Sequence, residues 1–163
     1  MPTAPKASPI SAGVAAPSFD LESSAGGRVT LDDFRGGKTV VLFFYPKADT
    51  PGCTKEACGF RDRIVDYAEA NVAVLGISPD PAPKVKKFAD KFGLGFPLLA
   101  DPDHAVAERY GVWGEKKFMG RAYLGVARTT FVIAPDGTIR QVFQDVKPDG
   151  HEREILAWIA ENA

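Results

Sequence analysis

The sequence predicts an α/β fold in which helices flank a central mixed β-sheet. Short apolar segments alternate with segments whose apolar residues recur every three to four positions, as buried strands alternate with amphipathic helices. Near the C-terminus, Asp136-Gly137 separates two further apolar segments, which is typical of an antiparallel hairpin. With 163 residues, 45% of them hydrophobic and 25% charged, the chain suits a single globular domain.

The first predicted element is an N-terminal β-hairpin extension. Its two strands alternate apolar and polar residues on either side of a turn rich in serine and glycine. The apolar positions of the strands are Phe19, Leu21, Val29 and Leu31. We expect residues 1–13, rich in proline, alanine and serine, to form a flexible arm, and a single domain to span residues 14–163.

Composition and charge exclude several classes of partner. The formal net charge of −1 argues against a nucleic-acid partner, and we interpret the cluster Lys84, Lys86, Lys87 and Lys91 as a solvated helix face. No apolar run reaches the length of a membrane span, and the N-terminal segment lacks the apolar centre and basic start of a secretory signal. We therefore expect a cytoplasmic protein with no membrane partner.

The segment 39–44 predicts a buried strand, because it is β-branched and aromatic and is bounded by two glycines before it and Pro46 after it. A helix should follow, with Thr50 at its N-cap and Pro51 at its first position. Cys53 then lies in the first turn, where unpaired amides and the helix dipole favour a thiolate. The predicted inward face comprises Cys53, Ala57, Phe60, Ile64 and Ala68.

A second strand and helix follow directly. Residues 72–77 read as a strand, and the next helix begins after a break at 78–81 and ends at Gly93. Its apolar face carries Val85, Phe88, Ala89 and Phe92. Two consecutive strand–helix pairs imply parallel strands joined by right-handed crossovers.

The remaining elements are shorter. Residues 96–100 are extended, and Asp101 or Asp103 caps a brief helix running to Tyr110. Residues 111–125 read as a long loop whose aromatics, with Met119, either pack or line a substrate mouth.

The C-terminal part completes the outline. Strands are predicted at 129–133 and 138–143, followed by a helix from 149 to 162. That helix places Ile155, Leu156, Ile159 and Ala160 towards the sheet. The order of elements is that of a thioredoxin-like fold.

The chain has two cysteines, Cys53 and Cys58, five positions apart. On one regular helix their Cα atoms are about 8.6 Å apart and rotated by roughly 140°, beyond the ~7 Å that a disulfide spans. Two interpretations stay open: two unrelated thiols, one of them packed in the core, or a pair that forms only when the helix unwinds. Gly59 favours the second, since glycine within a helix costs about 1 kcal/mol relative to alanine.

The sequence argues against a metal site, and we expect no cofactor. His104 and His151 are far apart, and neither has a cysteine or carboxylate cluster at ligand spacing.

Residues 46–53, Pro-Lys-Ala-Asp-Thr-Pro-Gly-Cys, resemble the Pro-x-x-x-Thr/Ser-x-x-Cys signature of the peroxiredoxins. A second cysteine five residues on is similar to the bacterioferritin-comigratory (PrxQ) subgroup, and the resemblance continues through 113–121 and 125–131. It runs from about Phe19 to the C-terminus. Pro46, Thr50, Cys53 and Arg128 match the four active-site positions of the family, and Cys58 matches the resolving position of the subgroup.

The resemblance implies a thiol peroxidase acting on hydrogen peroxide and organic hydroperoxides. Cys53 would be the peroxidatic cysteine and form a sulfenic acid, and Cys58 would condense with it to an intramolecular disulfide. Thr50 and Arg128 would supply donors at the reacting oxygens, Pro46 would shield the thiolate, and Glu56 would orient Arg128. The resemblance also implies a monomer recycled by thioredoxin or a glutaredoxin-like dithiol.

Two other functions use the same cysteines. A redox sensor or interaction module would expose a partner surface when its helix unwinds on oxidation. A general thiol–disulfide oxidoreductase is disfavoured, because the cysteine spacing is not Cys-x-x-Cys and because Arg128 stands where thioredoxins have a proline.

Overall fold

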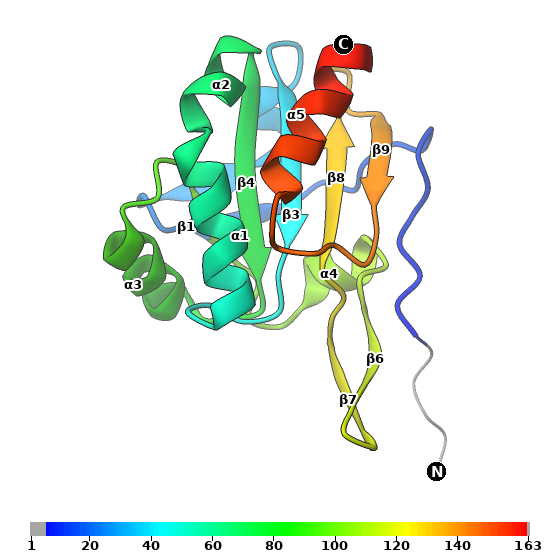
Figure 1. The fold of residues 1–163 in the computed structure, drawn as a ribbon. Helices are drawn as coiled ribbons and strands as arrows, with labels where there is room; N and C mark the ends of the chain where they lie inside the picture. Colours follow the sequence, from blue (N-terminus) through cyan, green and yellow to red (C-terminus); the bar gives the residue numbers. More distant parts are fainter. Residues whose placement is uncertain (1–5, 163) are drawn as a thin grey trace.

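The computed structural model describes residues 6–162, which form a seven-stranded mixed sheet, a separate two-stranded hairpin and helices on both faces of the sheet (Figure 1). The strands are β1 (Asp20–Ser23), β2 (Arg28–Thr30), β3 (Thr39–Phe44), β4 (Val72–Ser78), β5 (Leu98–Ala100), β6 (Trp113–Phe118), β7 (Arg121–Val126), β8 (Thr129–Ile133) and β9 (Ile139–Phe143). The helices are the 3-10 helix η1 (Leu31–Phe34), α1 (Pro51–Asp62), α2 (Ile64–Glu69), α3 (Ala82–Phe92), α4 (Ala105–Arg109) and α5 (His151–Asn162).

The sheet has the strand order β2-β1-β5-β4-β3-β8-β9. Strand β3 pairs parallel with β4 and antiparallel with β8, and β4 pairs parallel with β5. Helices α1 and α2 connect β3 to β4, and α3 connects β4 to β5. The predicted mixed sheet flanked by helices is confirmed, as is the N-terminal hairpin, formed by β1 and β2.

Strand β3 is buried because the sheet is covered on both faces. Val41 and Phe43 belong to the cluster that includes residues of α1, α2, α3 and α5. Val40, Leu42 and Phe44 belong to the cluster on the opposite face, which includes residues of η1 and α4. This alternation follows from the two-residue repeat of a strand. Because both faces of β3 are buried, its end holds the start of the connection to α1 in place.

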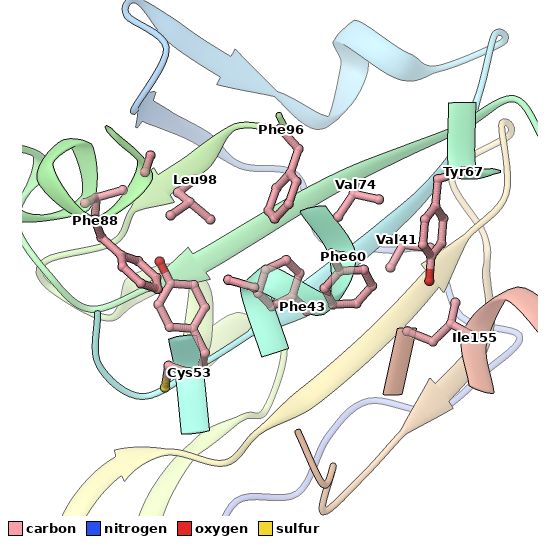
Figure 2. Packing of buried hydrophobic residues seen from close by; sticks show 14 of the residues in the cluster. Val41, Phe43, Cys53, Phe60, Tyr67, Val74, Phe88, Phe96, Leu98 and Ile155 are labelled. Carbon is pink, nitrogen blue, oxygen red and sulfur yellow. The ribbon is translucent and has the colours of Figure 1, made fainter. Parts of the chain in front are cut away.

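Phe60 attaches α1 to the sheet. Its ring stacks on that of Phe43 in β3, with centroids 4.7 Å apart, and contacts Tyr67 of α2 at 5.7 Å. In Figure 2, Cys53 lies at one end of this cluster, and Tyr67 and Ile155 lie at the other. The aromatic packing therefore holds the C-terminal part of α1, while Cys53 lies near its beginning.

The predicted long helix is two helices. Helix α1 ends at Asp62, and α2 starts after Arg63, whose backbone (φ −115°, ψ 12°) is not helical. Cys53, Ala57 and Phe60 are buried as expected and Ile64 is half-buried, but Ala68 is exposed, so its predicted inward position is wrong. The break turns α2 so that Tyr67 is buried instead.

The prediction of a loop at 111–125 is also wrong. These residues form most of an antiparallel hairpin of β6 and β7, in which Gly114 pairs with Gly125 and Lys116 with Tyr123. Met119 and Gly120 make its turn, both at positive φ (50° and 80°). The hairpin extends from the body of the molecule at the bottom of Figure 1.

The N-terminal segment lies against the domain from residue 6 onwards. The Ile10 amide donates to the Tyr110 carbonyl at 3.2 Å, and the Gly13 amide to the Ile139 carbonyl at 2.7 Å. A side chain at Gly114 would collide with the backbone of Ala7, so a glycine is required for this approach. Residues 1–5 of the expected flexible arm lie outside the described residues, and the domain boundary at residue 13 stays a prediction.

Apart from the β6–β7 hairpin, the elements from β5 onwards agree with the prediction except at their ends. The Asp101 carboxylate accepts hydrogen bonds from the amides of Val106 and Ala107 at the start of α4, as expected of a cap. Helix α5 starts at His151 and not at residue 149, and β9 starts at Ile139.

Helix α5 meets the sheet on a narrower face than predicted. Ile155 and Ile159 are buried and Leu156 is half-buried, whereas Ala160 is exposed, so its predicted orientation is wrong.

In the described part of the chain, no helix is both long and apolar enough to cross a membrane.

Candidate active site

Cys53 lies where β3 delivers the chain into the first turn of α1. Pro51 is the first helical residue, so Cys53 is the third, and its backbone amide has no carbonyl of a preceding helical turn to bond. Its side chain is 1% exposed and takes part in the main hydrophobic cluster. A buried thiol at the positive end of a helix is favoured as an anion only if a cation reaches it.

Arg128 is that cation. Its Nη2 donates to Cys53 Sγ at 3.3 Å, and its Nη1 donates to Glu56 Oε1 at 2.7 Å. Burial opposes the charged form of Arg128, but Glu56 and Cys53 outweigh it and raise the Arg128 pKa. The guanidinium thus bridges two residues that lie one helical turn apart on α1, as its planar fork allows.

The sheet brings Arg128 to α1 across 75 positions of sequence. Thr129, the next residue, starts β8 and is paired with Phe44 at the end of β3. Because these antiparallel strands place the start of β8 beside the end of β3, Arg128 and the loop that leads into α1 meet at one edge of the sheet.

Glu56 is fully buried, and only one of its oxygens is paired. Its side chain is 0% exposed, and Oε2 has no hydrogen-bond partner among the described residues. Burial raises the pKa of Glu56 to about 7, although the charge of Arg128 and its hydrogen bond act in the opposite direction. The charge on this carboxyl therefore changes near neutral pH.

Gly52 makes room for the guanidinium, a role that sequence reasoning missed. A Cβ at this position would lie 3.2 Å from Arg128 Nη2 and 3.5 Å from Pro148 Cγ. The sequence does contain a clue to this role, because a glycine in a helix lowers its stability and is usually there for a packing reason.

Thr50 and Pro46 lie in the connection between β3 and α1. Thr50 occupies the predicted N-cap position, with extended backbone, but its side chain does not cap the helix. Its hydroxyl donates instead to the Lys47 carbonyl at 2.8 Å, which closes the turn on itself. Pro46 is half-buried just before this turn.

Asp80 fixes the same turn from the neighbouring strand, and it was not among the predicted site residues. Its Oδ2 accepts hydrogen bonds from the Ala48 amide at 2.7 Å and from the Ser78 hydroxyl at 2.8 Å. Asp49, at φ 59°, pairs with Lys91 of α3 at 2.8 Å. The turn is therefore tied to β4 and α3 on the side away from Arg128.

Cys58 is half-buried and lies on the same regular helix as Cys53, and both thiols are free. This agrees with the expectation that the intact helix keeps the two sulfurs apart.

The two histidines are separate and serve different local contacts. His104 stacks on Trp113, with ring centroids 3.9 Å apart, and His151 lies between Thr130 and Glu154. Among residues 6–162, no group of three or more histidine, cysteine or acidic side chains gathers as metal ligands would.

The basic cluster of α3 and the residues Met119 and Tyr123 of the β6–β7 hairpin are exposed. Three of the four α3 lysines pair with aspartates, as a solvated helix face does. Met119 and Tyr123 project from the hairpin and are 88% and 46% exposed.

A thioredoxin-like α/β fold that holds one buried cysteine at a helix start, against an arginine, defines a thiol-dependent oxidoreductase. The sequence model of the AhpC/TSA family matches residues 12–142. The chain therefore belongs to the AhpC/TSA family.

Individual relatives agree. The chain is 49% identical over 155 residues to peroxiredoxin Bcp of Escherichia coli, covering 95% of this chain and 99% of that one. It is similar in structure to peroxidoxin BcpB of Mycobacterium tuberculosis (TM-score 0.83, 37% identity, 94% and 99% of the two chains). It also resembles the Xanthomonas campestris bacterioferritin comigratory protein, described for its alkyl peroxide reduction activity (TM-score 0.82, 34% identity, 88% and 90%).

The protein is thus a peroxiredoxin of the Bcp/PrxQ type, an enzyme that reduces peroxides with a thiol.

Proposed function

We propose that Cys53 is the peroxidatic cysteine and that the enzyme reduces hydrogen peroxide and organic hydroperoxides through a Cys53 sulfenic acid. The observation that carries this proposal is the Arg128 guanidinium, which donates to Cys53 Sγ and is held in place by Glu56. The alkyl peroxide reduction for which the Xanthomonas relative is described supports the organic substrates.

In the first step the Cys53 thiolate attacks one oxygen of the peroxide. A sulfur–oxygen bond forms, the O–O bond breaks, and the leaving oxygen departs as an alkoxide or hydroxide that takes up a proton. Negative charge moves from sulfur to the leaving oxygen, so donors fixed around both atoms stabilise the transition state. Arg128 and the amides at the start of α1 are those donors, and Thr50 is a further one if its hydroxyl turns from Lys47 to the peroxide.

Glu56 and Pro46 support the reaction without donating to the peroxide. Glu56 is a positioning residue, because it holds the guanidinium that touches Cys53. Pro46, which lies just before the turn fixed by Asp80, covers the thiolate and limits the access of water and of further peroxide.

In the second step Cys58 resolves the sulfenic acid. The Cys58 sulfur attacks the Cys53 sulfur, a disulfide forms, and the hydroxyl group leaves as water. Because five positions on a regular helix hold the two Cα atoms beyond disulfide reach, part of α1 unwinds first. Thioredoxin, or a glutaredoxin-like dithiol, then reduces the disulfide by exchange. We further propose that the enzyme acts as a monomer in the cytoplasm.

Single-cysteine variants test the two roles. Cys53→Ser should abolish peroxide consumption in an assay coupled to thioredoxin, thioredoxin reductase and NADPH. Cys58→Ser should still consume one equivalent of peroxide but should not recycle with thioredoxin. After one equivalent of peroxide, the wild-type protein should lose two thiols without forming a dimer.

The same assay separates the enzyme from a redox sensor. A slow, stoichiometric reaction with no turnover at any thioredoxin concentration would favour the sensor. Peroxide turnover that survives Cys53→Ser would falsify the peroxidatic assignment.

A further inference from the structure

An open cavity of about 510 Å³ lies beside Arg128, and cations dominate its lining. The N-terminal segment, strand β6 and the connection after β9 contribute to it. Its charged residues are Lys6, Lys116, Lys117, Arg128, Glu115 and Asp145. The cavity therefore shares one residue, Arg128, with the site around Cys53.

The charges of this cavity do not cancel. Among the described residues, no salt bridge joins Glu115 or Asp145 to the lysines of the lining. Arg128 is paired with Glu56, which lies outside the cavity lining. The lining itself holds four cations and two carboxylates, so an anion that enters the cavity meets a net positive charge.

Lys116 is the best-placed of the lysines to hold that anion. Its Nζ donates to the Val126 carbonyl at 2.9 Å, which fixes the ammonium group and leaves two further N–H donors. Burial lowers the pKa of Lys116, and the charge of Arg128 lowers it further, so an anion between the two would relieve their repulsion.

The hairpin is shaped to give Lys116 this position. Its side chain crosses Gly125 on β7, where a Cβ would lie 3.4 Å from Lys116 Cδ. Across the hairpin, Gly114 is paired with Gly125 and accepts the backbone of Ala7, which brings Lys6 to the same cavity. Gly114 and Gly125 thus allow Lys6 and Lys116, from two different segments, to reach the same cavity.

We propose that this cavity binds the carboxylate of an acidic organic hydroperoxide, and that Lys116 is the residue that determines this specificity. The proposal rests on the peroxidatic role of Cys53. Arg128 lines the cavity and donates to Cys53 Sγ at 3.3 Å, so a carboxylate at Lys116 and a hydroperoxide at Cys53 can belong to one molecule. The enzyme then oxidises its thiol faster with a hydroperoxy acid than with the neutral ester of the same acid.

The test compares a hydroperoxyalkanoic acid with its methyl ester. The second-order rate constant of Cys53 oxidation is measured for each by rapid quench, thiol alkylation and mass spectrometry. One charge-assisted hydrogen bond should favour the acid by about tenfold in the wild-type protein. Lys116→Met should bring the acid-to-ester ratio to about one, and Lys116→Arg should keep most of the preference, since it keeps the charge.

Lys87→Met is the matched control, because it removes the same charge from an exposed position on α3. It should leave the acid-to-ester ratio unchanged. Equal rate constants for acid and ester in the wild-type protein would overturn the proposal, as would a Lys116→Met variant that slows both substrates by the same factor. If hydrogen peroxide also fails to oxidise Cys53, the peroxidatic role itself is overturned.

Discussion

The buried Glu56 and the half-buried Arg128 form a pair whose charge balance changes with pH. A carboxyl whose pKa is raised by folding, as that of Glu56 is raised from 4.5 to about 7, stabilises the folded protein in its protonated form. This contribution is complete below about pH 4.5 and is lost as the pH rises through about 7. The protein is therefore less stable in the pH range in which Glu56, the residue that positions Arg128, is ionised.

Glu56→Gln should remove this dependence, because an amide still accepts a hydrogen bond from Arg128 but carries no charge. Between pH 4.5 and 7.5 the free energy of unfolding of the wild-type protein should fall, relative to that of the variant, by on the order of 3 kcal/mol. Urea unfolding at several pH values measures the difference. Burial lowers the pKa of His151, so its contribution to the pH dependence has the opposite sign, but His151 is present in both proteins and its contribution cancels in the difference.

A difference between the two proteins that stays constant across this pH range would contradict the prediction. It would mean that Glu56 is ionised throughout, with Arg128 offsetting its burial completely.

Single residues were predictable where a local rule applies to them. Cys53 and Thr50 follow from helix-start patterns, and the resemblance to peroxiredoxins added Arg128, which the structure places 3.3 Å from the sulfur. Asp80 was not found, because its partner Ala48 is 32 positions away and no periodicity in the sequence links the two.

At the level of elements, α1 is anchored to the sheet near its C-terminal end and has no side-chain cap at its start. Phe60 packs on the sheet, but Thr50 provides no side-chain cap, Gly52 and Gly59 lower helix propensity, and the helix stops at Arg63. A helix of this kind is suited to opening over a few turns without unfolding the domain.

Gly59→Ala tests whether this opening limits disulfide formation. A Cβ there would lie 2.6 Å from Glu152 Oε2, which is the end of a flexible side chain and can turn away. The alanine should stabilise α1 by up to about 1 kcal/mol, and so slow Cys58 attack by up to about fivefold. Oxidation of Cys53 should keep its wild-type rate, since Cys53 reacts in the intact helix.

Mass spectrometry of alkylated samples, taken at intervals after one equivalent of peroxide, follows both steps. The double variant Gly59→Ala, Glu152→Ala removes the obstructing carboxylate and should slow the disulfide at least as much. A more stable protein with an unchanged rate of disulfide formation would show that unwinding of α1 is not limiting.

The β6–β7 hairpin shows why some elements escape sequence reasoning. Its strands carry the charged run Glu115, Lys116 and Lys117 and the paired glycines Gly114 and Gly125, so apolar alternation is absent. Its stability comes from backbone pairing and from the N-terminal segment laid on its base, and neither leaves a periodic pattern.

The whole molecule depends on close packing through the centre of the sheet. Gly76 in β4 is buried, and a Cβ there would lie 2.7 Å from both Leu98 Cδ2 and Phe43 Cζ. Since the ring of Phe60 in α1 stacks on that of Phe43, the absence of a side chain at Gly76 helps to set the distance between the sheet and α1. The sequence could not reveal this, because the close approach depends on residues from three different strands.

Gly76→Ala should therefore destabilise the protein by about 1–3 kcal/mol through overpacking, measured by urea unfolding. Gly95→Ala is the control: its Cβ would make an ordinary 3.7 Å contact with Ile64, and the change should stay within about 0.5 kcal/mol. Equal effects of the two substitutions would mean that the core adjusts to the extra methyl group.

The seating of Lys6 and Ala7 beside the cavity has a practical consequence for handling the enzyme. A purification tag at the N-terminus is separated from Lys6 by only five residues, and a histidine or acidic tag there brings its own charges to the same end of the chain. The end of α5 lies at the opposite end of the molecule from the β6–β7 hairpin (Figure 1). Rate constants intended to report substrate preference are therefore best measured on protein tagged at the C-terminus.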